Sequence, residues 1–528
     1  MATTKVVECG PVSRGKVSQR PLFAVVAVLL GAFLASFDSR LFSLALPDIR
    51  GALSLSVDQG AWFNTAGTAS QIFISSAVAW IATAFGVRRV LVIPSLVYAV
   101  VSIILPLMHD FSTLLFLNVI RGLLLGAFVP TTLLVIFRTL PMQWWIASIA
   151  IFSIRVGFSM NFGETLVGYF IDHAGWQWIY WQDAIIAPLM GLAVYLGTEN
   201  EPVDRGLAKD ADWGGMLLLG SGMAMVYAGL DQGNRLDWLN SGQVTMLLAC
   251  GAILVAGFFV NEALVTKPWA SADVILSRNI GLALAITLLY TLTSLSNSSL
   301  APGFLTNVAQ LRLEQSGPLF LICAVVPMIF LLPVTVYVLK RYDARLSLIL
   351  GLSAFACAGL LGTQLTSQWR LFDFVPMVLL QSVGQSFALF SIVIITLSNS
   401  NPARSTAFAA YLQVSRLGGA EIGVSLMATF LRIKEQIASN LLGLNVTRGD
   451  ADVGHILNLL TSKFTPLGIG SASARATGTL AATVAREANT LAYIDGFWLT
   501  TWFAIAALIL ATFIGPAPPG PFSPPSAK

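Results

Sequence analysis

The stretch that decides the fold is LFAVVAVLLGAFLASFDSRLFSLAL, residues 22–46. An α-helix needs about 20 predominantly apolar residues to cross a hydrocarbon core about 30 Å thick, and this run is long enough. Two charged residues, Asp38 and Arg40, interrupt it. Charges are costly inside a bilayer and mark functional positions in membrane helices. We therefore expect a transmembrane helix that carries buried polar groups.

The composition extends this expectation to the whole chain. Of its 528 residues, 56% are hydrophobic and 11% are charged, whereas soluble domains carry about 25% charged residues. Most of the surface should therefore face lipid. Thirteen further apolar runs follow the first, at residues 60–82, 90–107, 111–137, 146–171, 179–196, 213–230, 244–260, 280–300, 319–338, 346–365, 374–397, 407–431 and 497–514. The sequence predicts an all-α integral membrane protein with fourteen spans, because helices pair their own backbone groups in lipid.

The distribution of Lys and Arg predicts the orientation. With the N-terminus inside, the short inner loops and the termini hold sixteen basic residues, against four in the short outer loops. Positive charge accumulates in cytoplasmic loops. We therefore expect an even number of spans with both termini in the cytoplasm.

The spans divide into two similar halves. FGVRRVL at 85–91 follows the second span, and LKRYDARLSL at 339–348 follows the tenth. Repeated halves are common in transporters, with the substrate site between them near the midplane. We predict a cytoplasmic tail (1–21), a six-helix bundle (22–200), an inserted helix pair (201–265), a second six-helix bundle (266–514) with an outer loop (432–492), and a Pro-rich cytoplasmic tail (515–528).

Three charges inside spans are the candidates for proton coupling: Asp38, Glu164 and Arg121. Burial favours the protonated form of a carboxyl group, and a nearby Arg favours the ionised form. Either carboxyl could therefore carry a proton if its distance from a guanidinium changed during a cycle. Arg121 would orient the carrier or meet an anionic substrate. The alternative is a permanent ion pair between Arg121 and one of the carboxylates that only holds helices together.

Three more charges inside spans, Arg155, Arg416 and Glu421, are candidates for substrate binding or gating. Arg155 lies nine residues before Glu164, about 13 Å away along a helix, so these two cannot pair directly. Arg416 and Glu421 diverge by about 140° on a helix, and structural and functional roles both remain open for them. Arg40 points away from Asp38, and its long side chain could extend to the outer surface.

Other chemistries lack their signatures. The four cysteines and three histidines are scattered along the chain, so we expect neither a metal site nor a cofactor. The phosphate-binding loop of ATP-driven pumps and the nucleophile motifs of hydrolases are absent from the sequence, so we do not expect an enzyme. The net charge of +4 is small, and we expect no nucleic-acid partner.

At this point the sequence resembles a known group, the fourteen-span drug:proton antiporters of the major facilitator superfamily, of the EmrB/QacA type. Nearly the whole chain takes part. The stretches that carry the resemblance are FDSRLFSLALPDI (37–49), VIRGLLLG (119–126), GETLVGYFIDHAGWQWIYW (163–181), RLGGAEIGVS (416–425) and LAYIDGFW (491–498). The resemblance implies the major facilitator fold, two six-helix bundles plus an inserted pair, and alternating access driven by protons. It also implies that Asp38 and Arg121 correspond to the coupling residues of the family.

Two motifs depart from the family pattern. The loop after the second span keeps Gly86, Arg88 and Arg89, which the resemblance identifies as a gating loop, but Thr83 and Ala84 replace its usual Asp-Arg pair. In the fifth span, Glu164 replaces the proline of the antiporter motif, and Gln177 replaces the Arg between two tryptophans.

We therefore expect proton-coupled export of amphipathic or hydrophobic small molecules from a bacterial inner membrane. Its partners would be the substrate, protons and lipid, and the outer loop 432–492 could contact a periplasmic adaptor protein. Within transport, the alternative is uptake or uncoupled exchange of an organic anion, with Arg121 and Arg155 as the binding charges. An alternative of another class is a membrane receptor or scaffold that uses the outer loop 432–492 for docking.

Overall fold

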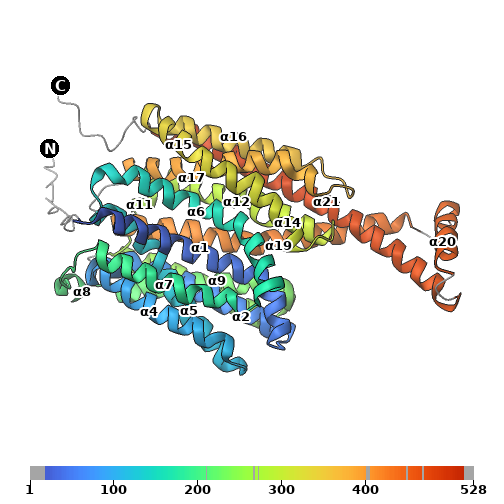
Figure 1. The fold of residues 1–528 in the computed structure, drawn as a ribbon, viewed down its shortest axis with the longest axis horizontal. Coiled ribbons are helices and arrows are strands. Elements are labelled where there is room, and N and C mark those ends of the chain that lie inside the picture. The colour runs from blue at the N-terminus through green and yellow to red at the C-terminus, as the bar shows by residue number, and fades with distance from the viewer. Residues whose placement is uncertain are drawn as a thin grey trace.

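The computed structural model describes residues 18–209, 211–265, 268–271, 273–399, 405–446, 450–465 and 469–515, and every regular element within these ranges is a helix. The helices run roughly side by side in one bundle (Figure 1). Twelve of them are long and apolar enough to cross a membrane, and a bent pair makes up to thirteen. The expectation of an all-α membrane fold is confirmed. The two predicted tails, 1–21 and 515–528, lie almost entirely outside the described residues.

The helices of the predicted first half are α1 (Pro21–Ala52), α2 (Val57–Ser75), α3 (Val78–Phe85), α4 (Val87–Ile104), α5 (Phe111–Thr139), α6 (Met142–Tyr169) and α7 (Trp178–Gly197). A short helix, α8 (Arg205–Lys209), leads to the predicted inserted pair, α9 (Trp213–Leu236) and α10 (Gly242–Leu264).

The predicted second half begins with α11 (Asp273–Leu276) and α12 (Arg278–Thr293), and continues with α13 (Ala301–Asn307), α14 (Leu313–Phe320), α15 (Val326–Arg341), α16 (Ala344–Gly362), α17 (Val375–Asn399), α18 (Ser405–Gln413), α19 (Gly419–Leu444), α20 (Ala451–Phe464) and α21 (Ile469–Phe513). Three π-helical turns join neighbouring helices in this half: η4 (Ser296–Leu300), η5 (Leu321–Val325) and η8 (Val414–Gly418).

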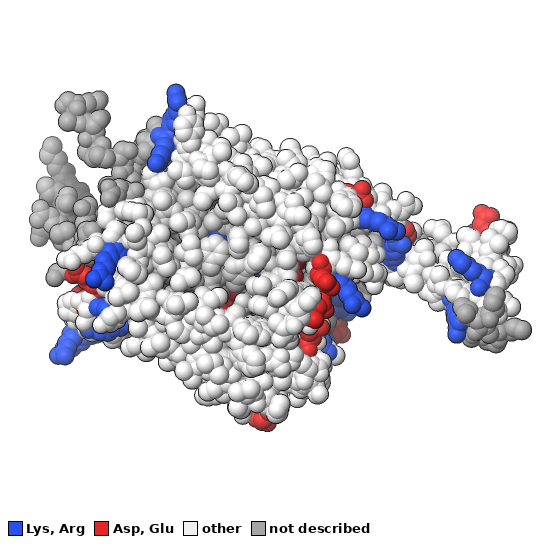
Figure 2. Space-filling view, in the orientation of Figure 1, with Lys and Arg blue, Asp and Glu red and all other residues white. Residues whose placement is uncertain are grey.

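The first and last spans begin and end at the same face of the bundle. Ser18, three residues before α1, donates its amide to the carbonyl of Thr139 at the end of α5. At the end of α21, Ile514 accepts a hydrogen bond from Arg345 at the start of α16. Figure 2 shows a nearly uncharged surface over most of the bundle, with charged side chains mainly near its two ends. An uncharged belt of this kind is what a lipid-facing surface requires.

Two predicted spans have an irregular form. The second, 60–82, is the bent pair α2 and α3, whose axes differ by 52°. The thirteenth, 407–431, corresponds to α18, the π turn η8 and the first part of α19. In the described residues, twelve or thirteen helices are long and apolar enough to span a membrane. The number of fourteen spans is consistent with this arrangement and stays a prediction.

The connection predicted as an outer loop, 432–492, is mostly helical. Helix α19 continues to Leu444, α20 follows, and α21 begins at Ile469. Figure 1 shows the start of α21 and the whole of α20 projecting beyond one end of the bundle. With 45 residues, α21 is about 67 Å long at 1.5 Å per residue, which is about twice the thickness of a hydrocarbon core. About half of this helix therefore lies outside the membrane.

Glycines allow the closest helix contacts in the bundle. A Cβ atom on Gly122 of α5 would lie 2.2 Å from the backbone oxygen of Gly67 in α2. Between the two halves, a Cβ atom on Gly317 of α14 would lie 2.8 Å from the Cα atom of Thr165 in α6. Small residues let backbones approach in membranes, where packing rather than the hydrophobic effect drives association.

We expect Gly122→Ala to destabilise the protein by about 1–3 kcal/mol, because the added methyl group has to push two backbones apart. The matched control is Gly478→Ala in the projecting part of α21, where a Cβ atom meets nothing within 4 Å. There, alanine should be neutral or stabilising by about 0.5–1 kcal/mol, because glycine weakens a helix. Unfolding midpoints of the purified proteins in detergent test this, and equal midpoints for the two variants would contradict it.

Candidate functional site

Four helices of the first half bring their polar side chains together around Arg121 of α5. Its Nη2 atom forms ion pairs with Asp38 of α1 and with Asp183 of α7, the latter at 2.5 Å. Its Nε atom donates a hydrogen bond to the hydroxyl of Ser102 in α4, at 3.3 Å. The structure thus brings two of the predicted residues, Asp38 and Arg121, into direct contact. We call Asp38, Arg121 and Asp183 the coupling cluster.

Aromatic rings enclose the coupling cluster. The guanidinium carbon of Arg121 lies 4.6 Å from the ring centre of Tyr180 and 5.1 Å from that of Tyr98. Tyr98 also donates its hydroxyl to Asp183, at 3.3 Å. Both tyrosines are fully buried, and Asp38, Arg121 and Asp183 are at most 3% exposed. Water is therefore largely excluded, and the electrostatic interactions within the cluster are strong.

Two carboxylates share one guanidinium in this cluster, so it carries one excess negative charge when both are ionised. An uncompensated buried charge is costly, and a bound proton removes it. Sequence reasoning missed Asp183. The signal was present, because this Asp is the fifth residue of the predicted span 179–196 and follows WIYWQ.

Glu164 of α6 lies apart from the coupling cluster. It is fully buried, and its Oε1 atom pairs with Nη2 of Arg40 at 3.0 Å. The prediction that Arg40 extends to the outer surface is therefore wrong, because a buried carboxylate on the neighbouring helix holds it. The hydroxyl of Ser316 in α14 lies 3.5 Å from the other carboxylate oxygen. Glu164 thus lies where the first half meets the second.

Glu421 of α19 is not paired with Arg416. Instead it lies within electrostatic range of Arg40 and of Asp231 in α9. Asp231 accepts hydrogen bonds from Thr65 of α2, at 2.5 Å, and from Ser425 of α19, at 3.4 Å. The inserted pair is therefore joined to both halves, since the carboxylate of Asp231 on α9 bonds one helix of each half.

Arg155 of α6 and Arg416 of η8 lie near the same aromatic ring, that of Phe152. The guanidinium carbons are 4.2 Å and 5.7 Å, respectively, from the ring centre of Phe152. Among the residues that the structure describes, neither arginine has a carboxylate partner. The structure therefore brings Arg155 and Arg416 close to each other and, among the described residues, brings neither to an acidic group.

The predicted gating loop is bound within the first half. Gly86 has φ of +89°, a conformation that favours glycine, and it separates α3 from α4. Arg88 donates a hydrogen bond to the carbonyl of Tyr195 in α7 at 2.6 Å, and Arg89 donates to that of Phe85 at 3.1 Å. In the described part of the chain, these arginines bond neighbours of the same half rather than the other half.

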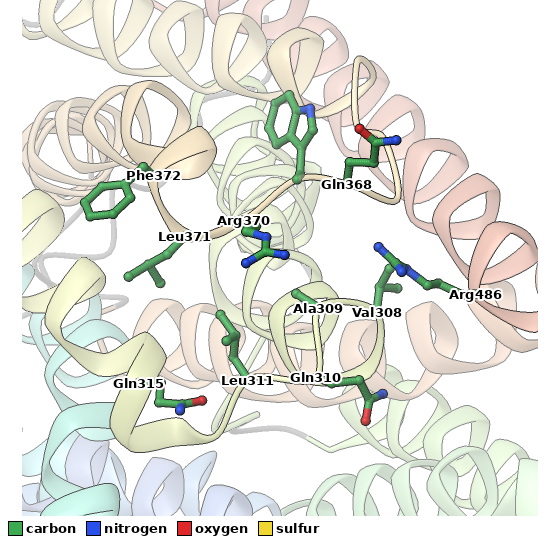
Figure 3. Close-up of a pocket in the computed structure, with 11 residues that line it drawn as sticks. Val308, Ala309, Gln310, Leu311, Gln315, Gln368, Arg370, Leu371, Phe372 and Arg486 are labelled. Atoms are coloured by element: carbon green, nitrogen blue, oxygen red, sulfur yellow. The ribbon is translucent and has the colours of Figure 1, made fainter. Parts of the chain in front are cut away.

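A separate cavity of about 620 Å³ lies near the projecting part of α21, away from the predicted site residues (Figure 3). Two cations, Arg370 and Arg486, contribute to its lining together with apolar and amide side chains. Arg486 of α21 donates a hydrogen bond to the carbonyl of Ser367. This cavity is formed by the second half alone, so it is not where substrate would pass between halves.

We expect Arg121→Gln to destabilise the protein by about 3–5 kcal/mol, because it leaves two buried carboxylates without a cation. The control is Arg235→Gln. Arg235 pairs with Asp58, whose side chain is 73% exposed, and such pairs contribute about 1 kcal/mol or less. Thermal unfolding in detergent at neutral pH distinguishes the two variants. Similar losses for both would show that the coupling cluster does not hold its helices together.

Comparisons with known proteins agree with this architecture. A family model described as Major Facilitator Superfamily matches residues 28–421. The multidrug export protein EmrB of Escherichia coli strain K12 is 23% identical over 505 residues, which cover 93% of this chain and 94% of the relative. EmrB of Haemophilus influenzae is 25% identical over 427 residues, 78% of this chain and 80% of the relative. The resemblance to the EmrB/QacA type is thereby confirmed.

A solved structure supports the fold alone. The crystal structure of the human organic anion transporter MFSD10 aligns with a TM-score of 0.55 at 14% identity, and covers 92% of this chain and 99% of that chain. The family model spans well over half of the sequence, and the helices form the membrane bundle that the resemblance implies. The chain therefore belongs to the major facilitator superfamily, and it is a membrane transporter of that fold.

Proposed function

We propose that this transporter exports amphipathic or hydrophobic small molecules in exchange for protons, by alternating access between its two halves. The observation that carries the proposal is the coupling cluster, in which Asp38 and Asp183 share Arg121 in a buried site. Such a cluster binds one proton readily, because protonation cancels the excess negative charge. When a helix that bears one of the three groups moves, the balance of charge changes, and the proton is released.

Glu164 supplies a second proton-sensitive contact. It is ionised when it pairs with Arg40, and the hydroxyl of Ser316 in the second half lies near it. Protonation of Glu164 would weaken its attraction to Arg40 and alter the contact between α6 and α14. Proton binding at this position would therefore be coupled to separation of the two halves, as an exchanger requires.

The energy of one proton is sufficient for useful export. A charge that crosses 100 mV releases about 2.3 kcal/mol. At about 1.4 kcal/mol per tenfold ratio, this sustains roughly a fifty-fold gradient of a neutral substrate. One exchangeable proton in the coupling cluster therefore suffices.

The similar proteins support the proposed direction of transport and the proposed location in a bacterial membrane. The similar proteins of Escherichia coli and Haemophilus influenzae are named multidrug export proteins. The excess of Lys and Arg on one side of the predicted spans supports a topology with both termini in the cytoplasm. We place the protein in the cytoplasmic membrane of a bacterium, with Gly86, Arg88 and Arg89 in the cytoplasmic gating loop and the projection of α19, α20 and α21 on the outer side.

The alternative of organic anion uptake or uncoupled exchange used Arg121 and Arg155 as binding charges. The structure disfavours Arg121 in this role, because Asp38 and Asp183 already neutralise it. The receptor or scaffold alternative depends on the projecting helices. As part of an exporter, the same projection is suited to contact a periplasmic adaptor protein.

We expect Asp38→Asn and Asp183→Asn to reduce proton-driven accumulation of dyes in inside-out vesicles to the level of vesicles without the protein, because an amide cannot carry the proton. Both variants should insert in normal amounts, since asparagine keeps the size of the side chain. Asp58→Asn, at the exposed ion pair with Arg235, should change transport by less than about twofold. An Asp38→Asn protein that still concentrates dye against its gradient would show that Asp38 is not the carrier.

The projection can be removed at a defined place. Lys434 of α19 pairs with Asp495 of α21 at 2.9 Å, so residues 445 and 484 lie at similar heights on these antiparallel helices. We expect a protein in which a short Gly/Ser linker replaces residues 446–483 to keep its flux in vesicles while cells lose drug resistance, if an adaptor docks there. Loss of flux in purified vesicles as well would contradict a docking role, and unchanged resistance in cells would show that no partner is required.

A further inference from the structure

We propose that Arg155 and Arg416 form a binding site for the anionic group of an amphipathic substrate, between the two halves. The proposal rests on the proposed function and narrows it, because it assigns both a substrate class and a place of binding. The two arginines come from different halves: Arg155 lies on α6 and Arg416 on η8, which joins α18 to α19.

Arg155 is held firmly, yet one of its donors is free. It is 1% exposed. Its Nε atom donates to the carbonyl of Phe152 at 2.9 Å, and its Nη1 atom donates to the hydroxyl of Ser36 in α1, also at 2.9 Å. Its buried Nη2 atom has no partner among the described residues. Buried donors are nearly always paired, so this guanidinium lacks an acceptor.

Arg416 reaches the same place from the second half. Its guanidinium carbon lies 5.7 Å from the ring centre of Phe152, on which Arg155 also stacks. Each arginine is within electrostatic range of the other. The residue belongs to the π turn η8, and such turns occur often at functional sites because they redirect side chains from the regular helical face.

The pair brings two like charges together. Among the described residues, neither guanidinium has an ion pair, although the other central arginine, Arg121, has two. Two desolvated cations without an anion are unfavourable. A carboxylate or sulfonate that binds between them removes the repulsion and accepts the free Nη2 donor of Arg155. Arginine suits such groups because its planar fork offers parallel hydrogen bonds.

Uncharged polar groups complete the site. Tyr290 of α12 lies within electrostatic range of Arg416 and donates its hydroxyl to the side-chain oxygen of Gln385 in α17, at 2.7 Å. The amide nitrogen of Gln385 is buried and has no partner in the described structure. Gln385 lies against Gly157, two residues after Arg155. A second unpaired donor therefore lies beside Tyr290, on the side of Arg416.

One turn along α6 from Arg155, an aromatic cluster extends to α1. Phe158 lies three residues after Arg155 on α6, on the same face. Its ring contacts those of Phe33 and Phe37 in α1, with ring centres 5.2 Å and 5.6 Å apart, and Phe162 extends the group. These rings are only partly buried. Cations beside an aromatic surface match a molecule with a charged head and an apolar body, and a small inorganic anion would leave the aromatic surface unused.

The experiment compares two probes that share a ring system. 1-Anilinonaphthalene-8-sulfonate carries a sulfonate, and N-phenyl-1-naphthylamine is its neutral analogue. Binding of each to the full-length protein in lipid nanodiscs is followed by fluorescence at equilibrium, with empty nanodiscs as the blank. We expect the anion to bind, and Arg155→Gln or Arg416→Gln to weaken it about tenfold or more. Arg341→Gln, at an exposed position where it bonds Tyr337, is the matched control and should not change binding.

Three further results decide the assignment. The double variant should bind the anion no more weakly than the worse single variant, because one anion bridges both arginines. Binding of the neutral probe should change less than twofold in every variant. Arg155→Lys, which keeps the charge, should recover part of the affinity for the anionic probe. Such a recovery would show that the loss in Arg155→Gln is not caused by misfolding.

Equal effects on both probes, or none on either, would overturn the proposal. Displacement of the anionic probe by chloride alone at physiological concentration, with no preference for the sulfonate over chloride, would assign the pair to an inorganic counter-ion and also overturn it. Because binding is measured without a proton gradient, and again in the Asp38→Asn protein, its outcome is independent of proton coupling. Failure of proton-driven export would therefore be recognised separately.

Discussion

The cost of a charge inside a bilayer is the constraint on which this structure depends. Each charge in a span has to be neutralised by protein, by a ligand or by a proton, because lipid offers nothing. Around Arg121 the protein supplies two carboxylates for one cation. Around Arg155 it supplies no carboxylate within the described residues. The first site has one negative charge too many, and the second has positive charge that is not balanced. A proton fits the first site and an anion fits the second.

These two sites lie on connected helices, which explains how their occupancy could be linked. Helix α1 carries Asp38, which pairs with Arg121, and also the hydroxyl of Ser36, which accepts a hydrogen bond from Arg155. The two residues are two positions apart on one helix and face different neighbours. A movement of α1 that changes the first contact therefore changes the second, and no long pathway of coupled side chains is required. Linkage of this kind needs only one helix with two positions, provided that the proton and the anion each bind one position more tightly than the other.

Much of the fold follows from residue types and their spacing, whereas the choice of which charged side chains pair between helices does not. Apolar runs of sufficient length predicted the spans, and the buried charges pointed to Asp38, Arg121 and Glu164. Pairing between helices depends on rotation and depth, which a single sequence does not specify. For this reason the sequence left Arg40 free to extend to the outer surface, although it pairs with Glu164. The helical projection was missed for another reason: its 432–492 segment is polar enough to lack a membrane signal, although α20 and the start of α21 are regular helices.

The contacts of the buried carboxyl group of Asp231 on α9 constrain how the two halves can move apart. Asp231 of α9 accepts a hydrogen bond of 2.5 Å from Thr65 in the first half and one of 3.4 Å from Ser425 in the second. Gln232 adds a second bond to Thr65, also at 2.5 Å. When the halves separate at this end, the longer contact is the weaker one, so α9 stays with α2. Helix α19 then withdraws from a carboxylate, and Glu421 on α19 loses a nearby like charge. Opening on this side would therefore break one weak hydrogen bond and move Glu421 away from Asp231.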